Sequence, residues 1–192
     1  YVLTLAESKR LYVDSRANTP INWSFIGPRG VMIDRVSLQS TDSWDGRYVF
    51  DVPAGVYQIR LQGPVGDYAL SFRDLANATA LTLGVPVSGV VDPANETHLN
   101  HFHAQAGDNV YLDMQSMANG DGTWRLYDPS GRLLRETPLS NDIERLALSY
   151  PGDYTLALEG RYYLTGTNAY RFQVQRVTDD ACRSSLRWAT SS

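Results

Sequence analysis

The chain has 192 residues, which is enough for one large β domain or two small ones, each with its own hydrophobic core. Its formal net charge of −4 excludes the basic surface that nucleic-acid binding requires, and no apolar run is long enough to cross a membrane as a helix. The only cysteine, Cys182, excludes an intramolecular disulfide and a metal site built on cysteines.

Short segments in which polar and apolar residues alternate follow one another along the chain. They are rich in β-branched and aromatic residues and are bounded by Gly, Pro, Asn or Asp, as β-strands are. No window shows a sustained 3.6-residue period with capping signals, so helices should be scarce and the expected class is all-β. In chain order the predicted strands are RLYVDS, INWSFIGP, RYVFDVPAG, VYQIRLQG, DYALSF, NVYLDMQ, TWRLYDP, RLALSYPG, YTLALEG and AYRFQVQRV.

The second half of the chain repeats the pattern of the first half. INWSFIGPRG aligns with GTWRLYDPSG at an offset of 101, LYVD with VYLD at 99, and AGVYQIRLQG with PGDYTLALEG at 97. The offset changes only between strands, so the insertions fall in loops, as expected for a duplicated β-sandwich. We predict that the repeated glycines occupy turns with positive φ and that the repeated aromatic residues point into the cores. These aromatic residues are Trp23, Trp124, Tyr12, Tyr111, Tyr57 and Tyr154.

The alignment also predicts the domain boundaries. Residues 1–75 form the first repeat, residues 76–178 the second, and residues 179–192 a tail or the start of a further repeat. The first repeat has no counterpart of ATALTLGVPVSGVVDPANETHLN, so we expect it to lack its opening strands and to expose a sheet edge. Because the sequence starts inside a predicted strand, we expect a fragment of a larger chain whose neighbouring domains are its partners.

The second copy carries the motifs GVPVSGVVDP, AGDNVYLD, LYDPSG and PGDYTL, followed by the aromatic strand AYRFQV. In these motifs, residues 78–177 resemble the bacterial pre-peptidase C-terminal domain, especially the tandem versions in large secreted or surface proteins of the adhesin and RTX kind. The resemblance implies a jelly-roll-like antiparallel β-sandwich that is non-catalytic and extracellular. Relatives usually have an acidic residue and a tyrosine where this chain has His98 and Asn100, so no ion or ligand role is carried over to these positions.

All three histidines of the chain lie in one predicted strand. His101 and His103 share its outer face, whereas His98 points to the core side with Phe102. Zinc requires three or four ligands, and neither an H-E-x-x-H motif nor a cysteine partner is present. We therefore interpret His101 and His103 as residues of a solvated strand face. The sequence also has no nucleophile elbow or phosphate loop, and carboxylate pairs such as Asp142 with Glu144 are typical of solvated loops, so we predict that the protein is not an enzyme.

The loops that differ between the copies are the candidate binding sites. In QSTDSWDGRY, Trp44 lies beside Asp45, with Arg47 beyond, and these side chains could stack on a sugar ring and bind its hydroxyl groups. The alternative, which we favour, is that Trp44 packs over the first core. In RYYLTGTN, Tyr162 and Tyr163 point in opposite directions, and a structural tyrosine in a longer hairpin is favoured over a ligand site.

The segments ANGDGT and DPANE offer oxygen ligands of the kind calcium accepts, although neither has EF-hand or RTX spacing. Calcium at a junction between repeats is therefore kept as a candidate, and zinc is not favoured. The predicted function is a non-catalytic module of a large secreted or cell-surface bacterial protein, acting in adhesion or as a structural spacer. The alternatives are a carbohydrate-binding module and an accessory domain of a secreted hydrolase. The expected partner is an extracellular glycan or protein surface, with no nucleic acid and no membrane insertion.

Overall fold

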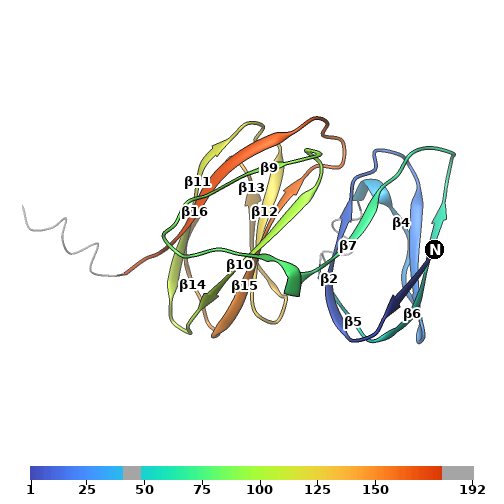
Figure 1. The fold of residues 1–192 in the computed structure, drawn as a ribbon, viewed down its shortest axis with the longest axis horizontal. Coiled ribbons are helices and arrows are strands. Elements are labelled where there is room, and N and C mark those ends of the chain that lie inside the picture. The colour runs from blue at the N-terminus through green and yellow to red at the C-terminus, as the bar shows by residue number, and fades with distance from the viewer. Residues whose placement is uncertain (41–48, 179–192) are drawn as a thin grey trace, which may run out of the picture.

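The computed structural model describes residues 1–40 and 49–178. Over these residues it is built of β-strands, with two single-turn 3-10 helices, η1 (Leu38–Ser40) and η2 (Leu75–Asn77) (Figure 1). Every strand pairing is antiparallel except that of β8 with β10. The expected all-β, sandwich-type class is confirmed. None of the described helices is long and apolar enough to cross a membrane.

The first pair of sheets, here called unit 1, encloses one hydrophobic core. Trp23, Phe25 and Tyr57 are at most 3% exposed and lie in that core, where the rings of Phe25 and Tyr57 stack with centroids 4.9 Å apart. One sheet has the strand order β1 (Val2–Leu5), β6 (Gly55–Gln62), β3 (Asn22–Gly27) and β4 (Gly30–Ser37). The other has the order β5 (Val49–Val52), β2 (Lys9–Ser15) and β7 (Leu70–Asp74).

The second pair of sheets, unit 2, encloses a larger core around Trp124, Tyr154 and Phe172, each fully buried. One sheet has the order β13 (Leu133–Pro138), β12 (Gly122–Tyr127), β15 (Gly152–Gly160), β10 (Thr97–Ala104) and β8 (Thr79–Ala80). The other has the order β14 (Ile143–Ala147), β11 (Asn109–Met117), β16 (Asn168–Arg176) and β9 (Val87–Val91).

The strand orders of the two units correspond. The order β1-β6-β3-β4 matches β10-β15-β12-β13, and β5-β2-β7 matches β14-β11-β16. Within the described part of unit 1, nothing corresponds to β8 and β9, which come from the segment that the first repeat was expected to lack. This correspondence is what a duplication requires, while the duplication itself and the boundaries after residues 75 and 178 stay predictions. The predicted tail at 179–192 lies outside the described residues.

The repeated glycines serve two different purposes. Gly30, Gly131, Gly55 and Gly152 have φ between 82° and 156°, as predicted for turns. The prediction is wrong for the pair Gly63 and Gly160, whose φ is not positive. A Cβ on Gly160 would lie 1.8 Å from the carbonyl oxygen of Ala94, so glycine is needed there for a close approach of two backbone segments.

The repeated tyrosines Tyr12 and Tyr111 do not lie in the sandwich cores, and that prediction is wrong. Because side chains alternate along a strand, Leu11 and Val13 fill the core of unit 1 and Tyr12 points away from it. Tyr111 likewise points outward, is partly exposed, and donates a hydrogen bond to Asp142. The other four repeated aromatic residues are buried in the cores as predicted.

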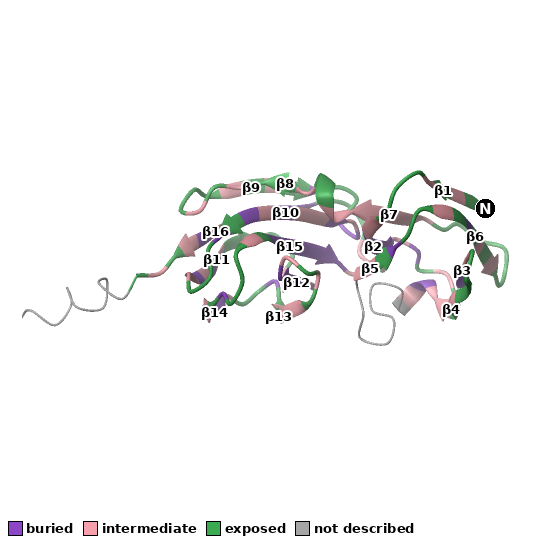
Figure 2. Ribbon diagram, turned by 90° about the horizontal axis from the view of Figure 1, so that it is seen from below, coloured by how far each residue is buried: buried purple, intermediate pink, exposed green. Residues whose placement is uncertain are grey.

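The four sheets follow one another along the long axis of the molecule, so the two units are stacked face to face (Figures 1 and 2). The sheet β5-β2-β7 of unit 1 packs on the sheet that contains β12, β15 and β10 in unit 2. An apolar cluster fills part of this contact: Tyr12, Tyr127 and Ala157, with Val49, Leu75, Leu99 and Leu133 against them. The central strands β2 and β15 are consequently buried on both faces.

Candidate functional site

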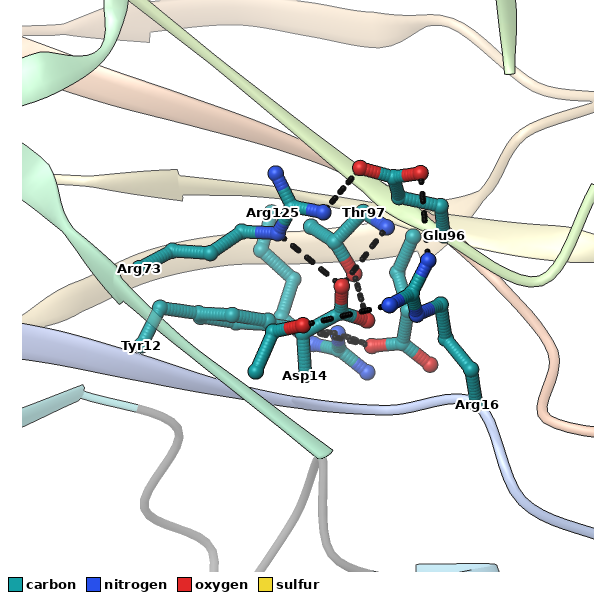
Figure 3. A network of polar contacts seen from close by, with 9 residues as sticks. Tyr12, Asp14, Arg16, Arg73, Glu96, Thr97 and Arg125 are labelled. Carbon is teal, nitrogen blue, oxygen red and sulfur yellow. Dashed lines mark hydrogen bonds and ion pairs between the residues drawn. The ribbon is translucent and has the colours of Figure 1, made fainter. Parts of the chain in front are cut away.

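Charged side chains from both units, some buried and some partly exposed, are bonded to one another where the units meet, and we call them the inter-unit network (Figure 3). Its first part joins Tyr12 of β2 to Glu159 and Arg125 on β15 and β12. The Tyr12 hydroxyl donates a hydrogen bond of 3.0 Å to Glu159 Oε2, and Arg125 forms an ion pair with the same carboxylate. The Nε of Arg125 also bonds Glu136 Oε2 at 2.9 Å. Arg125 and Glu159 are each 2% exposed, so this ion pair is shielded from water.

The second part of the network centres on Asp14, which is fully buried. Arg73 Nε lies 2.9 Å from Asp14 Oδ2, and Thr97 Oγ1 of unit 2 donates to Asp14 Oδ1 at 3.1 Å. Arg73 also forms an ion pair with Glu96, and Arg16 Nη1 lies 3.5 Å from Glu96 Oε2 (Figure 3). Arg16 and Arg73 of unit 1 thus pair with the carboxylate of Glu96 in unit 2. In the other direction, Thr97 of unit 2 donates a hydrogen bond to the buried carboxylate of Asp14 in unit 1.

The period-2 pattern of the strands places these residues at the contact. Tyr12 and Asp14 alternate with core residues on β2, and Glu159 follows Leu158, which faces the core of unit 2. Apart from Glu96, which lies in the candidate calcium segment DPANE, none of the network residues was predicted from the sequence as part of a site. One signal was available: YTLALEG is apolar at consecutive positions, which is typical of a strand that is buried on both faces.

Burial dominates the electrostatics of Asp14 and raises the pKa of its carboxyl group, although Arg73 and the bonds from Thr97 act in the opposite direction. Burial also lowers the pKa of the Arg73 guanidinium, but Asp14 and Glu96 together raise it above its ordinary value. For Arg125, burial is likewise outweighed by the phenol oxygens of Tyr12 and Tyr127 and by Glu136, so its pKa is raised. Both arginines therefore keep their charge inside the contact.

The raised pKa of Asp14 gives a test of this balance. In the folded chain the carboxyl group of Asp14 binds a proton more readily than in the unfolded chain. At neutral pH its ionised form therefore lowers the free energy of unfolding, and this loss disappears as the pH falls through the pKa of the folded chain toward 3.8. We expect the stability of the wild type relative to Asp14→Asn to rise between pH 7.5 and 4. Urea unfolding of both proteins at several pH values measures this difference. A decrease would mean that Arg73 and Thr97 outweigh burial.

The three histidines lie in three different surroundings. His98 points to the core side as predicted, its Nδ1 lies 3.1 Å from the Tyr170 hydroxyl, and burial lowers its pKa. His101 does not lie on a free face, because unit 1 stands opposite it: it lines a groove of about 370 Å³ between the units, together with Lys9 and Arg10. His103 is exposed and contacts Asp153 Oδ1 at 2.9 Å.

Over residues 1–40 and 49–178, no group of three or more His, Cys, Asp and Glu side chains is arranged to hold a metal ion. Calcium therefore stays a prediction without an assigned site. The candidate segments have structural roles in the fold: Asp121 of ANGDGT accepts a hydrogen bond from Tyr163, and Glu96 of DPANE belongs to the inter-unit network. Asp142 accepts hydrogen bonds from Tyr111 and from the backbone of Met114.

The predicted binding residues are only partly described. Trp44, Asp45 and Arg47 lie outside the described residues, so a role in binding stays a prediction. Tyr162 and Tyr163 form an edge-to-face pair with centroids 5.1 Å apart. Tyr163 is 41% exposed and donates a 2.7 Å hydrogen bond to Asp121, which raises the pKa of its phenol. The side-chain amide of Asn95 donates to the carbonyls of both Tyr162 and Arg16, each at 3.2 Å, so the backbone of this pair lies next to the inter-unit network. Its role in binding also stays a prediction.

No protein-family model and no curated protein matches the chain. Among solved structures, it is similar to the periplasmic g-type lysozyme inhibitor PliG of Aeromonas hydrophila, with 10% identity, a TM-score of 0.45, and coverage of 52% of this chain and 96% of that one. It is similar to the CUB1-EGF-CUB2 domains of human MASP-1/3 at 10% identity, a TM-score of 0.32 and 92% coverage of both chains. It is also similar to the pre-peptidase C-terminal domain of collagenase from Bacillus anthracis, with 20% identity, a TM-score of 0.41, and coverage of 52% and 95%. The last of these is a solved domain of the type that the motifs of the second copy resemble.

Proposed function

We propose that the chain is a non-catalytic β-sandwich module of a secreted or cell-surface bacterial protein, in which it acts as a rigid spacer that can present adhesive surfaces. The observation that carries the proposal is the inter-unit network. A spacer must hold its units at a fixed distance and angle, and a contact with buried, mutually bonded charges does this. The extracellular setting rests on the motifs of the second copy.

The network resists sliding and hinge motion because its central charges, those of Asp14, Arg125 and Glu159, are buried. A shift between the units would separate Glu159 from Tyr12, or Asp14 from Thr97, and leave polar groups buried without partners. Removing one partner of a buried ion pair typically costs about 3–5 kcal/mol. The apolar cluster around Tyr12, Tyr127 and Ala157 adds area that would be exposed to water by the same motion.

The chemistry of the network supports a structural role rather than catalysis. Its carboxylates and guanidinium groups are bonded to one another: Arg125 to Glu159 and Glu136, and Arg73 to Asp14 and Glu96. A catalytic acid or base must reach a substrate, whereas Asp14 and Glu159 are enclosed between two sheets.

Pulsed electron-spin distance measurements test the rigidity of the chain. Cys182 is first replaced by serine, and spin labels are attached at Val56→Cys on β6 and Val90→Cys on β9, two exposed positions in the outermost sheets. A spacer is expected to give one narrow distance distribution. The distribution should persist at about 1 M salt, where exposed charges are screened over about 3 Å but buried pairs are not.

Two results would contradict the proposal. A broad distribution in the labelled chain would show that the units move independently, and loss of the narrow distance in salt would show that the contact depends on exposed charges. The variant Lys9→Ser is the control for exposed charges. It removes ion pairs with Glu7 and Asp74 that lie at the rim of the contact, so the distance distribution should not change.

A further inference from the structure

A polar pocket lies where β7 of unit 1 meets unit 2, on the β8 side of β10. Its volume is about 500 Å³, and residues of β8, β9, β10 and β16 form most of its wall. Pockets that hold small molecules in proteins have volumes of about 300–1,000 Å³. The neutral polar residues that line it are Asn77, Thr79, Ser88, His98, Asn100 and Tyr170. The pocket therefore has the size and the polarity that suit a small polar ligand.

Asn100 is the residue of this pocket that points most directly to a ligand. It is only 4% exposed, yet it lines the pocket. No group in residues 1–40 and 49–178 forms a hydrogen bond with its side-chain amide. A buried amide without a bonding partner is destabilising, because it has lost its bonds to water. A ligand in the pocket would supply the partner that the fold does not.

His98 and Tyr170 form a fixed pair in the same wall. The Nδ1 atom of His98 lies 3.1 Å from the Tyr170 hydroxyl, and the two rings meet edge to face with centroids 5.8 Å apart. Gly89 is paired with Tyr170 across β9 and β16, and a Cβ on Gly89 would collide with the phenol, so glycine makes room for it. Burial lowers the pKa of His98, so its imidazole is neutral at neutral pH and its Nε2 is left to bond a ligand.

The charged side chains of the pocket are already paired. Arg73 is bonded to both Asp14 and Glu96, and Asp74 lies 3.0 Å from Lys9. An ionic ligand would have to compete with these ion pairs, whereas a neutral ligand would not. The remaining amide, hydroxyl and imidazole groups provide both donors and acceptors, as the hydroxyl groups of a ligand do. The pocket is therefore suited to a neutral ligand with several hydroxyl groups.

We propose that this pocket binds the terminal sugar residue of a glycan. Asn100, His98 and Ser88 bond hydroxyl groups of the sugar, while Val87 and Leu99, which also line the pocket, contact the C–H groups of its ring. Ser88 is exposed, so the pocket opens to solvent and the rest of the glycan can extend out of it. Because the pocket spans both units, the proposal requires the contact between them but not the spacer role.

NMR titration of the isotope-labelled full chain is the test, with the methyl glycosides of glucose, galactose, mannose and N-acetylglucosamine as probes. A methyl glycoside imitates a terminal residue, because its anomeric oxygen is blocked as in a glycan. We expect at least one of them to bind saturably with a Kd below about 10 mM and to shift the amide signals of Ser88, His98 and Asn100. Binding of a free sugar but of no glycoside would overturn the assignment to a glycan.

The variant Asn100→Leu separates binding from folding. Leucine has the same branched arrangement of side-chain heavy atoms but no polar group, so binding should weaken at least about tenfold while Tm stays the same or rises. An asparagine with a structural role would give a lower Tm instead. His98→Phe should also weaken binding. Asn22→Leu is the matched control, since it makes the same exchange at an exposed position of β3 and should leave binding unchanged.

Three results would overturn the proposal. The first is that no glycoside binds saturably, and the second is that binding is the same in Asn100→Leu and His98→Phe as in the wild type. The third is that the shifted signals are confined to Tyr162 and Tyr163, because the sugar would then bind at that hairpin. Each of these results leaves the spacer role untouched, since that role is tested by the distances between spin labels.

Discussion

Replacing Arg125 with methionine is expected to lower the free energy of unfolding by about 3–5 kcal/mol. Methionine fills much of the volume of the arginine side chain but leaves the carboxylate of Glu159, which is 2% exposed, without its ion-pair partner in the contact. The remaining cation, Arg161, lies 3.7 Å from the other carboxylate oxygen and is partly exposed. Urea unfolding of the variant and the wild type measures the difference.

Two further variants make this prediction specific. Arg135→Met is the matched control, since Arg135 is exposed on the neighbouring strand β13, and a change within about 0.5 kcal/mol is expected. The double variant Arg125→Met, Glu159→Leu should recover part of the lost stability, because no buried carboxylate then lacks a partner. If Arg125→Met alone were as stable as the wild type, the buried ion pair would have no role in holding the units together.

Gly160→Ala is expected to destabilise the chain by about 3 kcal/mol or more. The added Cβ would lie 1.8 Å from the carbonyl oxygen of Ala94 and 2.9 Å from the Cα of Asn95, and backbone atoms cannot move aside as a flexible side chain can. The neighbouring segment carries Glu96 and Thr97, so its displacement would also disturb the inter-unit network. Thermal and urea unfolding measure the loss.

Gly84→Ala is the control for backbone strain. Gly84 has φ of +81°, and a Cβ added there would meet no atom within 4 Å beyond its chain neighbours, so alanine should cost only about 1–2 kcal/mol. A loss at Gly160 no larger than at Gly84 would contradict the close-approach explanation. The pair therefore separates a steric conflict from the conformational preference of glycine.

The all-β class could be predicted because its signals are local. Alternating apolar residues and turn residues at strand ends are properties of a few neighbouring positions, and each of the ten predicted segments overlaps a strand. β4 and β13 were not among the predicted strands. The positive φ of the turn glycines Gly30, Gly131, Gly55 and Gly152 is predictable for the same reason. The aromatic core residues Trp23 and Trp124 follow from the same periodicity.

The contact between the units could not be predicted in this way. Tyr12 and Tyr111 occupy the same place in the repeated motif, yet Tyr12 is fully buried and Tyr111 is partly exposed. The difference arises because unit 2 covers the outer face of β2, while no described segment covers the outer face of β11. Local sequence determines which way a side chain points, but the neighbouring unit determines what it meets. For this reason the sequence alone does not reveal the role of Arg125 and Glu159.

The stacking of the units has a consequence in terms of symmetry. The sheet with β2 in unit 1 meets the sheet with β12 and β15 in unit 2, and these are not corresponding sheets, so the contact is heterologous. An isologous contact would close on itself as a dimer. A heterologous contact leaves one sheet of each kind uncovered, one at each end of the stack. Repeating the operation would generate an open array unless its rotation closed a ring. Since stacked sheets lie about 10 Å apart, each added sandwich would lengthen it by about 20 Å.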